Sequence, residues 1–326
     1  MMIMDTVLMS IIVPVYNVEK YIVDCISSII KQNGFDKIEL IIVNDGTRDR
    51  SVELIQPIIA DLPNVTLINQ ENAGLSVARN VGLKTAKGKY VWFVDSDDTI
   101  VPNAISLLFE NFESDSDCYG LNLLWVSESD GEKKRVGIWP DSATGLTGID
   151  FVQRMAHLTP VQRYVVKRDI LISNNLYFPP GILHEDLEYV PRLLYYVKGI
   201  RVISEPLYYY LRRVNGSITA KISERNLSGL CQGVYSVFHF TEEHVDKANR
   251  VIYYEKVYEM FQHFIHKYSE YLKGEEDWSI LGQNLAELKS VLKVIKGSLS
   301  FKEQIHVNCF LMFPSLYVKY RKSRIS

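Results

Sequence analysis

The first hundred residues alternate between two hydrophobic periods, and this alternation restricts the fold more than any other feature of the chain. A short apolar run at residues 10–15 is expected of a strand that is buried on both faces, a second apolar run follows at 38–43, and further strands are indicated at 64–69 and 90–94. The segments between them carry apolar residues at helical spacing, as in Ile22, Cys25, Ile26, Ile29 and Ile30. Strand–helix–strand repetition implies right-handed crossovers. We therefore expect an α/β fold with a doubly wound, mostly parallel sheet flanked by helices.

Beyond residue 115 the alternation loosens. We expect a strand at 118–126, a polar turn or hairpin tip at 127–134, a helix at 148–157 and an aromatic strand at 207–211. Residues 224–326 are mostly helical in pattern, and we find no internal repeat or low-complexity linker. The length of 326 residues suits one large domain or two smaller ones. We place an α/β domain at residues 1–220 and a mainly helical C-terminal region at 221–326.

Composition and charge exclude several classes of protein. Hydrophobic residues make up 47% and charged residues 23%, which is ordinary for a soluble globular chain. The formal net charge of -3 gives no positive field that would attract nucleic acid. The four cysteines have no metal-ligand spacing, which favours a reduced, cytosolic setting. The apolar N-terminus contains Asp5 and lacks a basic stretch, so we interpret it as a buried strand and not as a signal peptide.

No stretch reaches the ~18 apolar residues that span a bilayer. We therefore expect a cytoplasmic protein, or one at the inner face of the cell membrane.

Polar residues cluster where the four predicted strands end. In open parallel sheets ligands bind beyond the carboxyl ends of the strands. Asn, Asp and Gly are also common in ordinary turns, which would explain any one of these ends but is a weaker account of four in register. The residues are Pro14, Tyr16 and Asn17 after the first run, Asn44, Asp45 and Gly46 after the second, Asn72 and Gly74 after the third, and Asp95, Ser96, Asp97 and Asp98 after the fourth.

The DSDD run at 95–98 is the sharpest feature of the sequence. Three carboxylates within four residues repel one another unless a cation or a capped helix compensates them. Hard divalent ions such as Mg²⁺ or Mn²⁺ prefer carboxylate oxygens and often bridge to substrate phosphates. The alternative is a loop in which one aspartate caps a helix starting near Pro102, and that would account for only one of the three.

No phosphate-binding loop competes with a metal site. The segment from Gly82 to Lys89 has the wrong spacing for a P-loop, and Tyr90 stands where serine or threonine is required. A GxGxxG motif after the first strand is absent as well. Any phosphate must then be held by metal and basic side chains.

Two further polar clusters have both a functional and an ordinary interpretation. His184, Glu185 and Asp186 precede an apolar, helix-like run, and a carboxylate there could take a proton from an attacking hydroxyl. Read alone, the two acids are typical of a helix N-terminus. The cluster after the aromatic strand could grip a diphosphate, or be a solvated turn. Its residues are Arg212, Arg213, Asn215 and Ser217.

Taken together, these segments resemble family 2 glycosyltransferases with a GT-A fold. The matching segments are SIIVPVYN at 10–17, VNDGTRD at 43–49, NAGLSVARNVG at 72–82, YVWFVDSDD at 90–98 and HED at 184–186. Their order and spacing are specific, and the resemblance covers roughly residues 8–220. Two departures stand out: Thr47-Arg48 replaces the usual Ser-Thr, and YLRRVNGS at 210–217 does not align cleanly with the usual basic pattern. The second departure leaves open which arginine meets phosphate.

The resemblance implies roles for particular residues. Asp45 would accept a hydrogen bond from a uracil imide, and Arg79 would lie close to the same base. The region of Pro14, Tyr16 and Asn17 would hold the nucleotide. Within the family's DxD motif, Asp95, Ser96 and Asp97 would bind ribose and a metal on the diphosphate, with Asp97 the more direct ligand and Asp95 the second. Asp186 would be the general base accompanied by Glu185, and the loop with Arg213 and Ser217 would close over the diphosphate.

The implied activity is that of an inverting, metal-dependent glycosyltransferase. A hexosyl or N-acetylhexosaminyl group would pass from a nucleotide sugar, a UDP-sugar by expectation, to a hydroxyl of a saccharide or lipid-linked saccharide. The setting would be the assembly of a bacterial cell-surface polysaccharide, with Mg²⁺ or Mn²⁺ as cofactor. A nucleotide-sugar binding module without catalysis is one alternative, although it would not need to retain Asp186. A nucleotidyltransferase is another, but it normally needs a glycine- and lysine-rich loop after the first strand.

The C-terminal third lies outside the resemblance. Residues 309–318 (CFLMFPSLYV) are apolar, and the basic residues that follow them include Lys319, Arg321, Lys322 and Arg324, with no acid among them. This combination suits peripheral contact with anionic lipid, and the alternative is a packed last helix with a basic end. The i, i+3 pair of His263 and His266 is better explained by packing or surface placement than by a metal. The aromatic stretch at 253–271 is a helix core or a contact between copies in a homo-oligomer.

Overall fold

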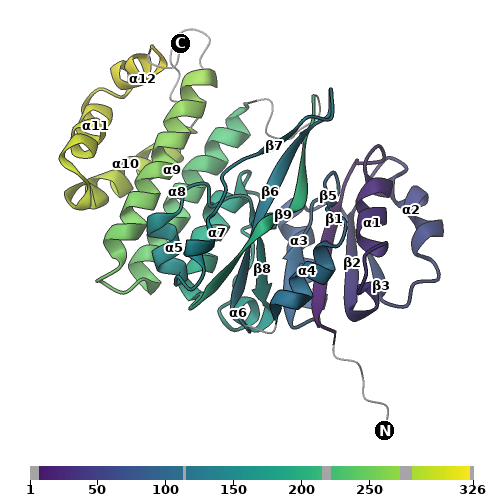
Figure 1. Cartoon of the computed structure of the whole chain (residues 1–326). Coiled ribbons are helices and arrows are strands. Elements are labelled where there is room, and N and C mark those ends of the chain that lie inside the picture. The colour runs from purple at the N-terminus through teal and green to yellow at the C-terminus, as the bar shows by residue number, and fades with distance from the viewer. Residues whose placement is uncertain (1–6, 113–114, 215–221, 272–280, 324–326) are drawn as a thin grey trace. The chain divides into compact units, whose positions relative to one another are not determined.

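The computed structural model describes residues 7–112, 115–214, 222–271 and 281–323 (Figure 1). The chain forms two compact units: Met1–Pro180 with Tyr196–Val214, and Gly181–Tyr195 with Asn215–Ser326. The second division lies near the domain boundary expected at residue 220. The segment 181–195, however, groups with the C-terminal helices, although it precedes that boundary in the sequence.

Four parallel strands form one half of the sheet in the first unit. Their spatial order is β3-β2-β1-β4, so the chain moves outward from β1 to β3 and then returns to the other side of β1. The strands are β1 (Met9–Val15), β2 (Ile38–Asp45), β3 (Val65–Gln70) and β4 (Tyr90–Phe93). The predicted alternation of strands and helices is confirmed over this half of the sheet.

The other half of the sheet is mixed in direction. It continues from β4 in the order β8-β6-β9-β5, with β7 paired to β6, and only the β6–β9 pair in it is parallel. The strands are β5 (Thr99–Ile100), β6 (Cys118–Ser127), β7 (Lys133–Arg135), β8 (Tyr164–Lys167) and β9 (Ile200–Arg212). The β6–β7 pair is the hairpin expected at 127–134, and β9 is a longer form of the expected aromatic strand. The predicted α/β class is thus confirmed, with a sheet that is parallel in one half and mixed in the other.

Helices cover both faces of the parallel half. One face is covered by helices whose buried residues join the strand residues Ile11, Val13 and Val15 in one core. These helices are α1 (Ile22–Ile30), α2 (Ser51–Ile59) and α4 (Ala104–Asn111). Helix α3 (Leu75–Thr85) packs on the opposite face, against Ile12. Two short helices, α5 (Gly148–Arg154) and α6 (Arg168–Ser173), complete the first unit.

The contact of α3 with β1 depends on a glycine. A Cβ atom at Gly82 would lie 2.3 Å from Cγ2 of Ile12, which is far inside van der Waals contact, and both residues are buried. We expect Gly82→Ala to lower the free energy of unfolding by about 1–3 kcal/mol, because α3 must shift to admit the methyl group.

Urea denaturation would measure this change. Gly199→Ala is the matched control, because a Cβ at Gly199 meets no atom within 4 Å, and it should stay within about 1 kcal/mol of the parent. Adding Ile12→Ala to Gly82→Ala removes the clashing methyl. The double variant should therefore lose less than the sum of the two single changes. Strict additivity would contradict the steric explanation.

A buried arginine stabilises the segment between β7 and β8 in a way that sequence reasoning did not predict. Arg163 is 2% exposed and lies over the ring of Trp139, 3.3 Å from its centroid. Its guanidinium donates to the carbonyl oxygens of Leu121, His157 and Gly137 at 2.6–3.1 Å. Carbonyl oxygens thus take the place of the carboxylate with which a buried arginine usually pairs. Burial lowers the pKa of Arg163 to about 10.

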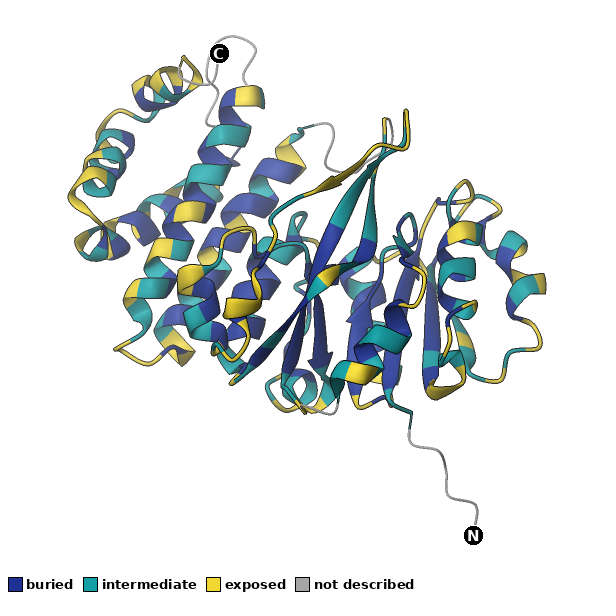
Figure 2. Cartoon of the chain, in the orientation of Figure 1, coloured by how far each residue is buried: buried dark blue, intermediate teal, exposed yellow. Residues whose placement is uncertain are grey.

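The second unit is helical, as expected of the C-terminal region. Its helices are α7 (Glu185–Tyr196), α8 (Glu224–His244), α9 (Arg250–Tyr271), α10 (Gln283–Ile295), α11 (Phe301–Met312) and α12 (Pro314–Lys322). Its core includes Phe261, Phe264 and Tyr268 of α9, so the aromatic stretch at 253–271 contributes to the core of this unit. Figure 2 shows buried positions along α9. Glu188 of α7 is buried and accepts from Arg192 and from Ser236 of α8. Among the described residues, no helix is long and apolar enough to cross a membrane.

Candidate functional site

The order of the parallel strands marks the place where a ligand would bind in the first unit. Strands β1 and β4 are neighbours, but the chain leaves β1 toward β2 on the opposite side. In open α/β sheets a crevice forms outside the carboxyl ends of two such strands. Tyr16 and Asn17 follow β1, and Asp95 to Asp98 follow β4. Two of the predicted residue groups therefore meet at this switch point.

The loop after β1 is tied to the loop after β2. Asn17 has a positive φ of 52° and its amide donates to Oγ1 of Thr47 at 2.8 Å. In return the amide of Arg48 donates to Oδ1 of Asn17 at 3.0 Å. Pro14 lies within β1, opposite Val43 of β2. Thr47 and Arg48, which depart from the usual Ser-Thr, thus form the hydrogen bonds that hold Asn17. The neighbouring Tyr16 side chain remains 39% exposed.

Asp45 ends β2 and organises the loop that leads into α3. It is 3% exposed, and its Oδ1 accepts from Gln70 Nε2 at 2.7 Å and from the amide of Ala73 at 2.8 Å. Its Oδ2 accepts from the amide of Gly74 at 2.8 Å and from Asn72 Nδ2 at 3.2 Å. A carboxylate offers about four acceptor positions, and these four donors use them. A uracil imide could bond to Asp45 only by replacing one of them, Gln70 Nε2 being the most adaptable.

Asp95 is paired with a buried arginine from α3. The NH2 group of Arg79 donates to Oδ1 of Asp95 at 2.7 Å, and the arginine side chain is 1% exposed against 25% for the aspartate. The guanidinium also lies 5.1 Å from the ring centroid of Phe178. The backbone amide of Asp95 donates to the hydroxyl of Tyr208 on β9. Arg79 was expected near the base of a nucleotide, and in this structure it orients the first carboxylate of the DxD segment.

Asp97 is paired with Arg213, which follows β9. Nε of Arg213 donates to Oδ2 of Asp97 at 2.6 Å, and its NH2 group contacts the same oxygen. Burial and the nearby charge of Asp95 raise the pKa of Asp97, and Arg213 opposes that rise. The aspartate is 20% exposed and the arginine 17%. Two arginines from distant elements thus compensate two of the three carboxylates.

Asp98 differs from its two neighbours. It is 2% exposed, and its oxygens accept from the hydroxyl of Tyr208 at 2.6 Å and from the amide of Leu211 at 2.7 Å. Burial, followed by the charges of Asp97 and Asp95, raises its pKa well above the ordinary value. Both partners are on β9, so Asp98 fastens that strand to the loop after β4. Ser96, between Asp95 and Asp97, is also buried.

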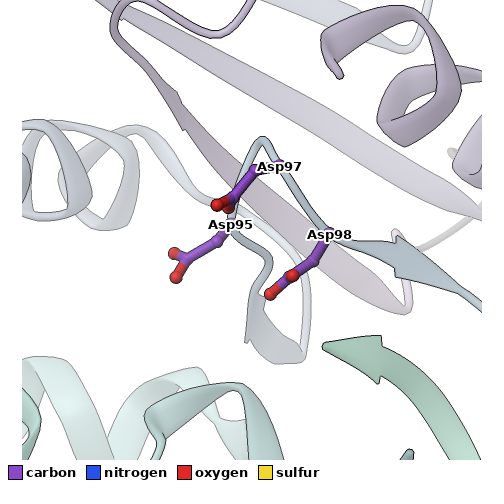
Figure 3. A group of neighbouring side chains, drawn as sticks. All are labelled: Asp95, Asp97 and Asp98. Atoms are coloured by element: carbon purple, nitrogen blue, oxygen red, sulfur yellow. The ribbon is translucent and has the colours of Figure 1, made fainter. Parts of the chain in front are cut away.

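The three carboxyl groups can come together around a small cation. One oxygen of each lies within 4.8 Å of the others, and Figure 3 shows all three side chains projecting from the loop after β4. The donor set consists of hard carboxylate oxygens, which suits Mg²⁺ or Mn²⁺. Asp95 and Asp97 are partly exposed, whereas both oxygens of Asp98 serve β9. The residues therefore fit a divalent ion held mainly by Asp97 and Asp95.

Glu128, at the tip of the β6–β7 hairpin, supports Arg213 and was not singled out by the sequence. It accepts from the hydroxyl of Tyr21 at 2.8 Å and from the amide of Val214 at 2.8 Å, and it pairs with Lys20. The hydrogen bond from Lys20, then those from Val214 and Tyr21, lower its pKa to about 2. The guanidinium of Arg213 lies 4.9 Å from the Tyr21 ring centroid. Because nothing but a long-range contact distinguishes Glu128, no local pattern could have revealed it.

A surface cavity of about 400 Å³ lies elsewhere in the first unit, at the amino end of β4. Lys89, Lys167 and Arg168 are among its lining residues. Asp115 pairs with Lys89 at 2.8 Å and with Lys167 at 3.4 Å, so carboxylate already balances these ammonium groups. We assign the cavity no part in the site.

The two carboxylates that were expected to supply the general base lie in the second unit. Glu185 and Asp186 are the first residues of α7, where the helix dipole favours negative charge. His184 before them has a φ of 65°, and its ring centroid lies 6.1 Å from that of His263 on α9. Burial lowers the pKa of both histidines, that of His263 to about 4. The structure thus joins Arg79, Asp95, Asp97 and Arg213 within one unit, whereas Asn215 and Ser217 lie outside the described residues.

Comparisons with known proteins agree with one another. The sequence model described as "Glycosyl transferase family 2" matches residues 10–167. The uncharacterized glycosyltransferase YibD of Escherichia coli K12 is 35% identical over 231 residues, which cover 68% of this chain and 66% of YibD. The glycosyltransferase GlyG of Streptococcus pneumoniae is 31% identical over 223 residues, which cover 65% of this chain and 72% of GlyG. The match therefore spans just under two thirds of YibD and somewhat more of GlyG.

Among solved structures, residues 1–349 of S. aureus TarS in complex with UDP-GlcNAc superpose with a TM-score of 0.72 at 20% identity. The superposition covers 97% of this chain and 88% of that one. This likeness extends the agreement in fold to the helical C-terminal region, which lies beyond residue 167.

Proposed function

The chain belongs to glycosyl transferase family 2, and from that premise we propose that it moves a sugar from a UDP-sugar to an acceptor hydroxyl with inversion at the anomeric carbon. The observation that carries the proposal is the carboxylate pair Asp95 and Asp97 at the carboxyl end of β4, each with an arginine partner, beside the switch point of the sheet. Uridine as the nucleotide is supported by the similarly folded TarS, which was solved with UDP-GlcNAc.

The donor would lie across the ends of β1 and β4. The exposed ring of Tyr16 offers a surface for the base, and Pro14 and Asn17 shape the loop that carries it. Asp45 sets the neighbouring loop through four hydrogen bonds and reaches the base only if one of them is exchanged. The ion pair with Arg79 would orient Asp95 toward ribose and diphosphate. Hexosyl and N-acetylhexosaminyl groups are the sugars proposed.

Asp97 and Asp95 would hold Mg²⁺ or Mn²⁺, and the bound ion would neutralise the charge that develops on the departing diphosphate. Arg213 supplies a positive charge beside Asp97, because its side chain already donates a hydrogen bond to that carboxylate. Once Asp97 has another positive partner, Arg213 can turn the Nε and Nη2 donors that contact Asp97 toward phosphate oxygen. Ser217, four residues later, is proposed to act on the same diphosphate.

Asp186 is the proposed base, with Glu185 beside it at the start of α7. The acceptor oxygen would form its bond to the anomeric carbon as the bond from that carbon to the diphosphate oxygen breaks. The hydroxyl proton passes to Asp186, and UDP leaves with the electron pair of the broken bond. One displacement of this kind inverts the configuration. The acceptor is proposed to be a saccharide or a lipid-linked saccharide of a bacterial cell-surface polysaccharide.

Calorimetric titration with UDP, with and without Mn²⁺, tests the donor site directly. GDP and CDP serve as matched ligands that differ only in the base. We expect UDP to bind at least roughly tenfold more tightly with Mn²⁺ than without it, because the ion links carboxylates to diphosphate. Release of UDP from a panel of UDP-sugars then identifies the donor. Equal binding of all three nucleotides would contradict uridine specificity, and no binding of any would contradict the nucleotide site.

A further inference from the structure

Helices α11 and α12 in the second unit present large apolar side chains to solvent. The described chain exposes twelve large hydrophobic residues, and six of them fall between residues 301 and 320. They are Phe301 (80% exposed), Ile305 (45%), Met312 (63%), Phe313 (57%), Leu316 (64%) and Tyr320 (47%). Scattered exposed apolar residues are ordinary, but this concentration in one short segment marks an interaction surface. We call these six residues the C-terminal apolar face.

The apolar face is not a fragment of the unit's own core. The core sides of the two helices pack on α9 through other residues: Phe310 contacts Phe261, and Tyr317 bonds to Gln262. Along α11 the exposed positions 301, 305 and 312 follow helical spacing, as do 316 and 320 along α12, and exposed Phe313 joins the two helices. Each helix is thus apolar on two sides, one packed and one exposed. Figure 2 shows exposed positions along both helices.

Basic residues occur in the same two helices. Lys302 accompanies Phe301, and Lys319, Arg321 and Lys322 occupy the last turns of α12. The one acid in the described stretch 299–323 is Glu303, and it is engaged in the cap of α11, where it accepts from Ser300 at 2.6 and 2.8 Å. Four positive charges therefore flank large apolar side chains with one engaged negative charge among them.

We propose that the C-terminal apolar face docks on an anionic lipid bilayer. Short helices with Phe and Leu on one side and Lys or Arg on the flank bind at the boundary of head groups and acyl chains, where the apolar side chains leave water and the cations meet phosphate. A second copy of the chain is a poorer occupant, because a contact between two such faces would gather the positive charges of both copies in one interface that has Glu303 as the one acid of the described stretch 299–323. The inference is independent of sugar transfer, since it concerns where the protein resides and not what it transfers.

Co-sedimentation of the full chain with vesicles tests the proposal. We expect the chain to pellet with phosphatidylcholine vesicles that contain phosphatidylglycerol, and far less with phosphatidylcholine alone. The triple variant Phe313→Ser, Leu316→Ser, Tyr320→Ser should lower the apparent partition coefficient by roughly tenfold or more, because three large side chains no longer enter the lipid. The double variant Lys319→Glu, Lys322→Glu should lose a similar factor at low salt.

Matched changes elsewhere in the second unit serve as controls. Val251 is 45% exposed on α9 and Lys247 is exposed just before it, so Val251→Ser and Lys247→Glu should leave vesicle binding unchanged. Circular dichroism of each variant distinguishes lost binding from lost folding. Binding that is equal for the parent and the triple variant overturns the proposal. So does a parent dimer in sedimentation velocity that the triple variant converts to monomer, because the face would then be a contact between copies. UDP titration of the same samples reports on the donor site separately.

Discussion

Asp186→Asn is expected to lower the rate of sugar transfer by about 10²–10⁴-fold while leaving UDP binding within a factor of two or three of the parent. Asparagine keeps the size and hydrogen-bonding reach of the side chain but cannot accept the acceptor's proton. The position at the first turn of α7 is compatible with either residue, since asparagine is also tolerated near helix N-termini. The rate is measured as UDP released in the presence of acceptor, and binding by titration with UDP and Mn²⁺.

The control for this variant is Asp169→Asn. The Asp169 side chain is 89% exposed on α6 and contacts only Arg168 across 3.6 Å among the ion pairs of the described residues, so the change should be silent. A second readout separates loss of the base from misplacement of the helix. Glu188 of the same helix bonds to Arg192 and Ser236, and the unfolding midpoint of Asp186→Asn should match the parent if that network is intact. Transfer at the parental rate would remove Asp186 from the mechanism.

Asp97→Ala is expected to abolish the part of UDP affinity that depends on divalent metal, a loss of roughly tenfold or more. The Asp97 side chain is 20% exposed and pairs with Arg213, which is itself partly exposed, so stability should change little. Titration of UDP with and without Mn²⁺ measures the effect, and urea denaturation verifies the fold. The transfer rate should fall with the affinity.

Asp98→Asn is the informative companion to Asp97→Ala. Because Asp98 is buried and bonds to Tyr208 and Leu211, this variant should lower the stability of the first unit by about 1–3 kcal/mol. Its UDP affinity should keep its dependence on Mn²⁺. If Asp98→Asn instead removed metal-dependent binding at unchanged stability, Asp98 would be a metal ligand and its inferred role of fastening β9 would be wrong.

Local patterns were sufficient to predict the parallel half of the sheet. There β1, β2 and β4 are nearly continuous apolar runs and α1 and α2 are amphipathic segments, so periodicity along the chain identifies them, while β3 is the partly exposed edge strand. The same reasoning brought Tyr16 and Asp95 to one edge, because carboxyl ends of parallel strands coincide. The mixed half was not predictable in this way. Whether β8 runs antiparallel to β4 depends on pairing between residues some seventy positions apart, and such pairing leaves no local period.

The electrostatic partners of the site carboxylates were the other part of the structure that could not be predicted from the sequence. Three adjacent carboxylates implied a compensating cation, and the structure supplies Arg79 and Arg213 from α3 and from the end of β9. Repulsion alone is therefore no argument for a metal in this chain. The argument that remains is the hard oxygen donor set of Asp95 and Asp97 and its position at the switch point. Asp45 is similar, since its four donors from the end of β3 and the loop after it could not be inferred from its turn-like sequence.

The close approach of Gly82 to Ile12 also affects how a mutational survey of this protein should be interpreted. Arg79 lies one helical turn before Gly82 on α3, so the glycine sets the height at which the guanidinium meets Asp95. A substitution that lifts the helix would displace that guanidinium, and the variant would then lose donor affinity without any change to a residue of the site. A map of inactivating substitutions would consequently extend along α3 into the hydrophobic core. Selection for thermostability and selection for activity would act on the same positions of this helix.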